Sequence, residues 1–318
     1  MLRTFSRRDL LRGVSLALPA WGLNLARGGH AESPLPFKLG IITDEISQDM
    51  ERALEFLKSY SLGYCELREL WDKNIMNASE EELARAQQLL RQYGMKVSDI
   101  ASPLFKYDLP EMPAPESQRD VFRAQFTEKD TDRLLERATD LAHRFDTRLI
   151  RIFSYWRVED PEKAYRFVRD RLARAAEVAG KHGVTLCLEN EPACNVGTGR
   201  ELGRILKDIN SPHLHGVWDP GNAVTLGEAA YPEGYNAVRG LFPHMHVKDL
   251  RKDALTGKWI WVPVGQGVVD YRRLFKVLRE EKYSGTISLE THYRRADGNA
   301  MESTRESLAG LLQLLREV

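Results

Sequence analysis

The stretch Gly183–Pro192, GVTLCLENEP, joins a short apolar run to two carboxylates. The run VTLCL has the length and apolar character of a β-strand that is buried on both faces, as strands of parallel sheets are. This run ends abruptly at Glu189, and Glu191 follows two positions later. Carboxylates at the end of a buried strand indicate either a solvated loop or a bound cation, so the remainder of the chain must distinguish the two.

Short β-like runs alternate with longer amphipathic segments from residue 37 onward. The predicted strands cover residues 38–43, 64–67, 96–100, 148–153, 184–189, 215–219, 244–249 and 286–290. Strand–helix alternation predicts a parallel sheet. Eight repeats within residues 37–318 fit one closed (β/α)8 TIM barrel, a fold of about 250 residues. A doubly wound open sheet is the alternative, but it usually has a glycine-rich turn after the first strand, where this chain has TDEISQD.

Capping residues also predict where three of the helices begin or end. The segment 49–60 has apolar residues at helical spacing, with Ser47 as the expected N-cap. The segment 159–183 begins with an acidic residue and a proline and ends at Gly183. In the segment 303–315, Ser303 and Glu306 have the spacing of a capping box.

The N-terminus resembles a twin-arginine export signal. Residues 6–13, SRRDLLRG, place Arg7 and Arg8 before a weakly apolar run that is too short and too interrupted by proline to span a bilayer. We therefore expect residues 1–31 to be a cleaved signal, and the mature protein to be periplasmic or secreted without stable membrane association. An ordinary basic tail is the alternative.

The amino-acid composition limits the kinds of binding partner that the protein is expected to have. Lys+Arg and Asp+Glu both total 46, so no net charge favours nucleic acid or an anionic membrane. The three cysteines cannot all pair within one chain, and their spacing favours no particular disulfide. A homo-oligomer is compatible with this composition.

Charged and polar residues end four consecutive predicted strands. Glu189, Asp219 and Glu290 end the fifth, sixth and eighth strands, and the seventh carries His246. In a (β/α)8 barrel these ends converge on the face where active sites lie. Carboxylates held that close would repel each other and take up protons unless a cation lay between them. Three carboxylates and one imidazole favour Mn²⁺, with Mg²⁺ or Co²⁺ as alternatives.

Each of these residues has another interpretation when taken alone. An Asp before Pro-Gly, as at Asp219, is usually a turn former. A single histidine such as His246 is more often a core or surface residue, and Glu290 fits an exposed strand end. The metal site is predicted from their joint occurrence.

Four segments in this order resemble the sugar phosphate isomerase/epimerase superfamily, whose members are xylose isomerase-like barrels. They are LENEP (188–192), WDPGNA (218–223), HVKDL (246–250) and the segment from VGQG to ISLE (264–290). The resemblance implies that Glu189, Asp219, His246 and Glu290 bind the metal. It also implies that Glu189 and Glu290 remove and return a proton beside a substrate carbonyl, which the metal polarises.

Other polar residues at the strand ends are candidates for substrate binding: Glu66, Arg68, Asn222, Lys248 and Arg251. Many relatives have a histidine where this chain has Asn222, and an amide can hydrogen-bond a hydroxyl but cannot act as a strong base. Internal ion pairs are the alternative for Glu66, Arg68 and Lys248, and a solvated side chain is the alternative for Arg251.

The sequence predicts a metal-dependent isomerase or epimerase that acts on a small sugar or keto sugar. Expected export and the lack of a glycine-rich phosphate loop favour an unphosphorylated substrate. A keto-sugar lyase or dehydratase using the same site is one alternative, and a non-catalytic sugar-binding subunit is another. A nuclease related to endonuclease IV is disfavoured, because the chain has only eight histidines and a net charge of zero.

Overall fold

The computed structural model describes residues 37–115 and 125–318. The chain divides into two units, Met1–Pro34 and Leu35–Val318, and the described residues all belong to the second. The predicted export signal, with Arg7 and Arg8, lies outside the described residues. Among the helices that are described, none combines the length and the apolar character that a membrane span requires. All three cysteines are buried free thiols.

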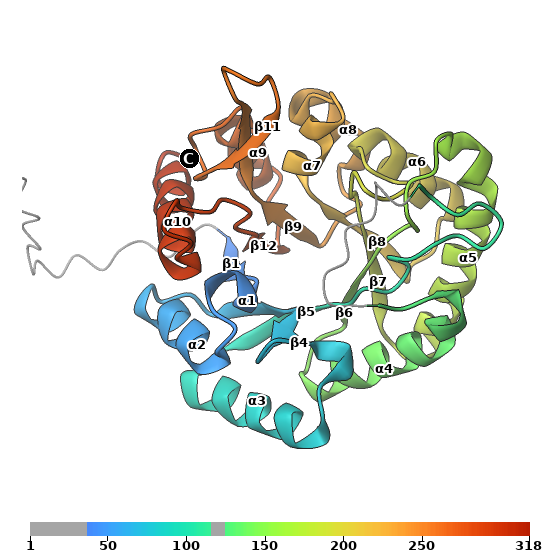
Figure 1. The fold of residues 1–318 in the computed structure, drawn as a ribbon, viewed down its shortest axis with the longest axis horizontal. Coiled ribbons are helices and arrows are strands. Elements are labelled where there is room, and N and C mark those ends of the chain that lie inside the picture. Colours follow the sequence, from blue (N-terminus) through green and yellow to red (C-terminus); the bar gives the residue numbers. More distant parts are fainter. Residues whose placement is uncertain (1–36, 116–124) are drawn as a thin grey trace, which may run out of the picture. The chain divides into compact units, whose positions relative to one another are not determined.

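Eight parallel strands form a nearly closed barrel (Figure 1), which confirms the predicted fold. They are β1 (Lys38–Ile41), β2 (Tyr64–Leu67), β5 (Lys96–Ala101), β6 (Leu149–Ile152), β7 (Thr185–Glu189), β8 (Leu214–Trp218), β9 (His244–Val247) and β12 (Thr286–Leu289). Each strand pairs with its neighbours in chain order, and β1 pairs with β12. A parallel bridge between Ile42 and Glu66 joins β1 to β2. This circular order excludes the doubly wound open sheet.

Helices surround the strands (Figure 1). The longer ones are α2 (Met50–Ser59), α3 (Glu80–Tyr93), α4 (Thr131–Arg144), α5 (Pro161–Lys181), α6 (Gly199–Ile209), α9 (Tyr271–Glu280) and α10 (Ala300–Arg316). Short helices are α1 (Thr43–Ile46), α7 (Pro220–Thr225) and α8 (Tyr235–Val238), with 3₁₀ turns at Ile75–Asn77 and Glu128–Asp130 and a π turn at Ala230–Gly234. Buried apolar side chains fill the layer between strands and helices.

Two helices begin at residues other than the predicted caps. The cap of α2 is Asp49, whose side chain accepts hydrogen bonds from two backbone N–H groups, whereas Ser47 accepts one from Asp49 itself. The cap of α10 is Asn299, and Ser303 lies inside the helix and donates to the Asn299 carbonyl. In both cases the side chain nearest the first free N–H groups of the helix is the cap. Helix α5 begins at Pro161, as predicted.

Two antiparallel hairpins extend the barrel at the ends of β2 and β9. One joins β3 (Glu69–Leu70) to β4 (Lys73–Asn74), and the other joins β10 (Asp249–Lys252) to β11 (Trp259–Val262). The predicted strand 244–249 is therefore interrupted at Lys248. The Tyr271 hydroxyl holds this break, because it donates to the Lys248 carbonyl at 2.7 Å and accepts from the Lys248 N–H at 3.1 Å.

Candidate active site

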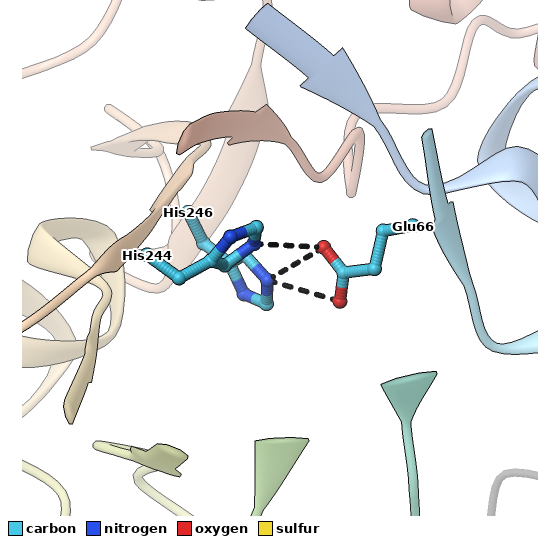
Figure 2. Close-up of side chains that lie close together, drawn as sticks. All are labelled: Glu66, His244 and His246. Carbon is cyan, nitrogen blue, oxygen red and sulfur yellow. Dashed lines mark hydrogen bonds and ion pairs between the residues drawn. The ribbon is translucent and has the colours of Figure 1, made fainter. Parts of the chain in front are cut away.

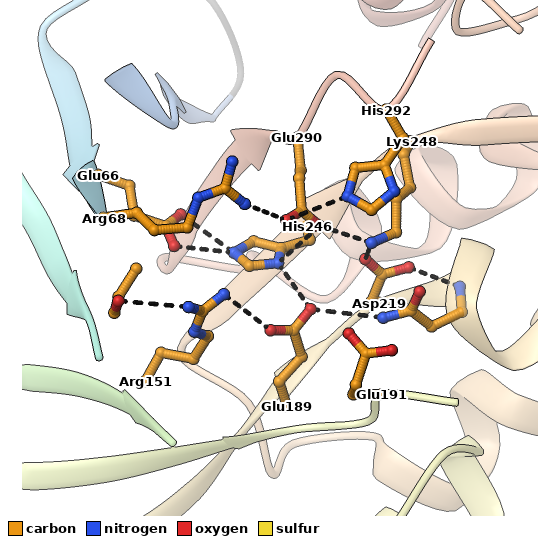
Figure 3. Close-up of polar contacts among 12 residues, drawn as sticks. Glu66, Arg68, Arg151, Glu189, Glu191, Asp219, His246, Lys248, Glu290 and His292 are labelled. Atoms are coloured by element: carbon orange, nitrogen blue, oxygen red, sulfur yellow. Dashed lines mark hydrogen bonds and ion pairs between the residues drawn. The ribbon is translucent and has the colours of Figure 1, made fainter. Parts of the chain in front are cut away.

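The four predicted metal ligands lie together at the carboxyl ends of the strands (Figure 3). Glu189 is the last residue of β7, Asp219 follows β8, His246 lies in β9 and Glu290 follows β12. One donor atom from each lies within 4.8 Å of the other three. All four side chains are buried. The structure thus brings these residues together, and their binding of a metal remains a prediction.

The ends of β7 and β8 are held to each other by Asn190. Its side-chain oxygen accepts from the Asp219 backbone N–H, and its amide donates to the Asp219 carbonyl, both at 2.8 Å. Asp219 is also the N-cap of α7, because its Oδ1 accepts from the Asn222 N–H at 2.8 Å. These bonds fix Asp219 with its other oxygen, Oδ2, directed toward the cluster.

His246 bridges the cluster and the interior of the barrel. Its Nδ1 lies 3.0 Å from Glu189 Oε1 and 3.6 Å from Glu290 Oε2. Its Nε2 lies 3.0 Å from Glu66 Oε2 on the other side of the ring. Burial would lower the pKa of His246, but the charges of Glu66 and Glu189 outweigh burial and raise that pKa well above its usual value.

Lys248 places an ammonium group between two of the predicted ligands (Figure 3). Its Nζ lies 2.5 Å from Glu290 Oε2 and 3.1 Å from Asp219 Oδ2. Burial would lower the pKa of Lys248, but these carboxylates raise it. Burial would likewise raise the pKa of Glu290, but Lys248 and His292 hold it well below its usual range. Both groups are therefore charged at neutral pH.

An arginine contacts each of the two predicted catalytic glutamates. Arg68 Nη1 lies 2.9 Å from Glu290 Oε1, and its Nη2 reaches Asp44 Oδ2 at 2.7 Å and Glu45 Oε1 at 2.6 Å. Arg151 Nη1 lies 3.2 Å from Glu189 Oε2. Burial would raise the pKa of Glu189, but His246 and Arg151 outweigh it and lower the pKa to about 2.

The candidates for substrate binding have different surroundings. Arg68, Asn222 and Lys248 are buried and contact the predicted ligands; Asn222 does so through its amide, which donates to Glu189 Oε1 at 3.4 Å. Glu66 is fully buried beneath His246. Arg251 lies on the exposed part of β10, and no contact between it and the cluster is recorded among the described residues.

Sequence reasoning missed three buried residues of this region: Asp99, Arg151 and His244. Each is a charged or titratable residue within a predicted strand of a barrel, where buried side chains are usually apolar, which is the signal that could have identified them. His244 also lies two positions before His246, so the two side chains occupy the same face of β9.

The donor set fits a divalent cation. Three carboxylates and an imidazole converge on one point, and the buried Asp219 Oδ2 has the Lys248 ammonium, at 3.1 Å, as its one recorded partner among the described residues. Burial raises the pKa of Asp219 to about 6, because Glu189 and Glu290 add to burial and Lys248 offsets only part of the effect. A divalent ion would stabilise all three carboxylates in the ionised form.

Comparisons with known proteins agree with this architecture. The profile of the family described as Xylose isomerase-like TIM barrel matches residues 54–314. Inosose dehydratase of Bacillus velezensis is 26% identical over 144 residues, which are 41% of this chain and 48% of that protein. L-ribulose-5-phosphate 3-epimerase UlaE of Escherichia coli is 29% identical over 190 residues, which are 58% of this chain and 63% of that protein. The chain thus matches about half to three-fifths of the length of these relatives.

Solved structures share the fold. The IOLI protein with a bound zinc atom has a TM-score of 0.65 and 16% identity, and the match covers 88% of this chain and 99% of that one. The 3-keto-D-glucoside 4-epimerase YcjR of E. coli has a TM-score of 0.62 and 17% identity, and the match covers 87% and 98% of the two chains. With the family profile covering most of the barrel, the chain belongs to the xylose isomerase-like TIM barrel family.

Proposed function

We propose that this protein is a divalent-metal-dependent isomerase or epimerase of an unphosphorylated sugar or keto sugar. The observation that carries the proposal is the convergence of Glu189, Asp219, His246 and Glu290 within 4.8 Å at the carboxyl end of the barrel. The similarity to an epimerase and to a dehydratase supports an enzyme that acts on sugars. Mn²⁺ is the metal we propose, from the oxygen-rich donor set.

The two glutamates are suited to opposite roles in proton transfer. Arg151 orients Glu189 from the β6 side, and Arg68 orients Glu290 from the β1–β2 side. Both carboxyls have lowered pKa values and are therefore ionised, as a base must be. One glutamate, ionised, would take a proton from the carbon beside the carbonyl, and the other, after taking up a proton from solvent, would return one from the opposite face. A bound divalent ion would supply polarisation of the carbonyl.

Three arguments support an unphosphorylated substrate. The chain has no glycine-rich phosphate loop after its first strand, where α1 begins instead. The proposed twin-arginine signal at residues 1–31 would export the protein from the compartment in which most phosphorylated sugars occur. One structural neighbour is a 3-keto-D-glucoside epimerase.

Dehydration of a keto sugar is the second candidate. Lys248 Nζ lies 2.5 Å from Glu290, so a buried ammonium group stands beside the proposed acid/base. After proton removal from the carbon beside the carbonyl, this pair could protonate a departing hydroxide. The similarity to inosose dehydratase supports this alternative.

Solvent exchange tests the proposal. The protein, reloaded with Mn²⁺, is incubated in D₂O with free ketoses and 3-keto glycosides, and NMR spectra are taken after removal of the metal. We expect metal-dependent deuterium incorporation at one carbon, absent from a chelated control. Deuterium incorporation into a product that retains all its oxygen atoms supports isomerisation or epimerisation. A product that has lost one water molecule supports the dehydratase. Absence of exchange and of product for every substrate would favour a non-catalytic sugar-binding protein.

A further inference from the structure

Glu66 is fully buried and faces two histidines of β9 (Figure 2). Its Oε2 lies 3.0 Å from His246 Nε2 and 3.1 Å from His244 Nε2, and its Oε1 lies 3.2 Å from His246 Nε2. All three side chains are fully buried. Both oxygens of the carboxylate therefore contact imidazole nitrogens, which leaves it no exposed oxygen for a substrate.

The two nitrogens of His246 have different surroundings, and Glu66 can accept a proton only from Nε2. A neutral imidazole carries a proton on one nitrogen, and an ionised carboxylate can only accept a hydrogen bond. Both nitrogens of His246 face a carboxylate at 3.0 Å, Glu66 at Nε2 and Glu189 at Nδ1, but only Nδ1 also faces the cluster. A metal bound in the cluster would take the Nδ1 lone pair and leave the single proton on Nε2, where Glu66 accepts it. Nδ1, which faces Glu189 and Glu290, then presents its lone pair to the cluster.

We propose that Glu66 is a positioning residue that holds His246 in the Nε2–H tautomer and orients its Nδ1 lone pair toward the metal. Metal-binding histidines commonly donate their other N–H to a carboxylate, and loss of that partner weakens metal affinity. This inference replaces the role in substrate binding that the sequence suggested for Glu66. It rests on the metal site of the proposed function.

The fold holds Glu66 in this position through contacts on several sides. Strands β2 and β9 are not neighbours in the barrel, so the contact with His246 spans the interior. The β2–β5 ladder shifts register between Cys65 and Leu67, and such irregularities re-aim side chains near active sites. The Glu66 backbone takes part in the bridge to Ile42 that joins the first two strands, and its carbonyl accepts from the Thr43 hydroxyl at 3.3 Å.

His244 completes the arrangement. Its Nε2 donates to the same Glu66 oxygen as His246 Nε2, so both imidazoles stabilise the ionised form of Glu66. Asp99 lies farther away, with its Oδ1 3.5 Å from His244 Nε2, and no contact with His246 is recorded for it within the described parts of the chain. Asp99 is therefore a matched control: a second buried carboxylate of the same interior that does not hold His246.

Metal titration of the full chain tests the proposal. Metal-free wild type, Glu66→Gln and Asp99→Asn are titrated with Mn²⁺, and free Mn²⁺ is counted by EPR. We expect one Mn²⁺ per wild-type chain and a Kd about 10–100-fold higher for Glu66→Gln, because the neutral amide no longer fixes the tautomer. Asp99→Asn should bind Mn²⁺ with the wild-type Kd. Circular dichroism checks that each variant is folded.

A spectroscopic measurement separates positioning from a general effect on stability. Chains labelled with ¹⁵N-histidine are loaded with Zn²⁺, which is diamagnetic, and the His246 signals are assigned by their loss in His246→Gln. We expect wild type and Asp99→Asn to show the proton on Nε2 and a metal-shifted Nδ1. Glu66→Gln should lose this single tautomer. If Glu66→Gln does not fold, Glu66→Asp replaces it, and we expect an intermediate Kd because the carboxylate is one methylene shorter.

Several results would overturn the inference. Wild-type affinity and tautomer in Glu66→Gln would do so and would leave the metal site itself intact. An equal loss of affinity in Asp99→Asn would show a general electrostatic effect of the interior. Two Mn²⁺ per wild-type chain, reduced to one in Glu66→Gln, would show that Glu66, together with His244 and His246, binds a second metal ion. Failure of the wild type to bind any metal would instead contradict the proposed function.

Discussion

At the scale of single residues, the two carboxylate oxygens of Glu290 contact two different cationic side chains. Its Oε1 contacts Arg68 at 2.9 Å, and its Oε2 contacts Lys248 at 2.5 Å. A buried carboxylate that keeps its charge needs such partners, because burial favours the neutral acid. The sequence predicted Glu290 as an acid/base group, but its cationic partners became apparent only from the structure.

Glu290→Gln should abolish turnover while the protein stays folded. The amide keeps the shape of the side chain but cannot accept a proton, and loss of a general acid or base costs about 10²–10⁴-fold in rate. The measurement is metal-dependent deuterium exchange, with circular dichroism as the check of the fold. Glu136→Gln makes the same change on the exposed surface of α4 and should retain full activity. Full activity of Glu290→Gln would remove this residue from the mechanism.

Lys248→Met should make the metal-free protein depend on added cation. Without the ammonium group, Asp219 and Glu290 remain buried but lose their shared cationic partner. Loss of one partner of a buried ion pair lowers the unfolding free energy by about 3–5 kcal/mol. Chemical unfolding with EDTA or with Mn²⁺ measures the effect. We expect Mn²⁺ to raise the unfolding free energy more in Lys248→Met than in the wild type, because the metal no longer competes with the lysine. Equal gains in the two proteins would contradict this competition.

At the scale of elements, Asp249 ties the β10–β11 hairpin to the loop before α9. Its carboxylate accepts from four backbone N–H groups, those of Leu250, Gly265, Gly267 and Val269. A Cβ on Gly267 would lie 2.0 Å from Asp249 Oδ1, so the loop requires glycine there. The HVKD and GQG segments, which lie about 18 residues apart, are thus two halves of one hydrogen-bonded turn.

Asp249→Asn should destabilise this element. The amide nitrogen cannot accept, so the backbone N–H groups that it faces lose their partner, at a cost of about 1–3 kcal/mol for a buried group. Urea unfolding measures the loss. Asp253→Asn is the control. Asp253 accepts hydrogen bonds from two backbone N–H groups of the same hairpin, but these bonds are exposed to solvent. The decrease in unfolding free energy should therefore be smaller for Asp253→Asn than for Asp249→Asn. Similar losses in both variants would count against a special role of Asp249.

At the scale of the whole molecule, barrel closure brings residues from strands that are far apart in sequence into one site. Arg68 and Glu290 are separated by 222 positions and form a direct ion pair, because β1, β2 and β12 meet where the barrel closes. The order of the strands around the barrel also places Glu66 within reach of His246, 180 positions later. A parallel barrel produces such contacts because the carboxyl ends of all its strands lie on one face.

Export is the second property of the whole molecule. We propose that Arg7 and Arg8 direct the protein to the twin-arginine pathway, so the double variant Arg7→Lys, Arg8→Lys should accumulate in the cytoplasm. Cell fractionation followed by immunoblotting measures the distribution. Arg12→Lys changes one arginine outside the pair and should leave export intact. An unchanged periplasmic or secreted fraction in the double variant would contradict the signal assignment.

Local patterns in the chain were sufficient for the eight strands, the barrel and the four residues that gather at its carboxyl end. Strand periodicity and parallel pairing follow from short-range steric and hydrophobic constraints, and barrel geometry then places the ends of the strands together. Local sequence patterns could not predict which side chains contact one another in the site. Whether Glu66 faces a substrate or His246, whether Lys248 pairs with Asp219, and whether Arg251 reaches the site depend on contacts across the barrel. Such contacts are set by distances in three dimensions, which spacing along one chain does not contain.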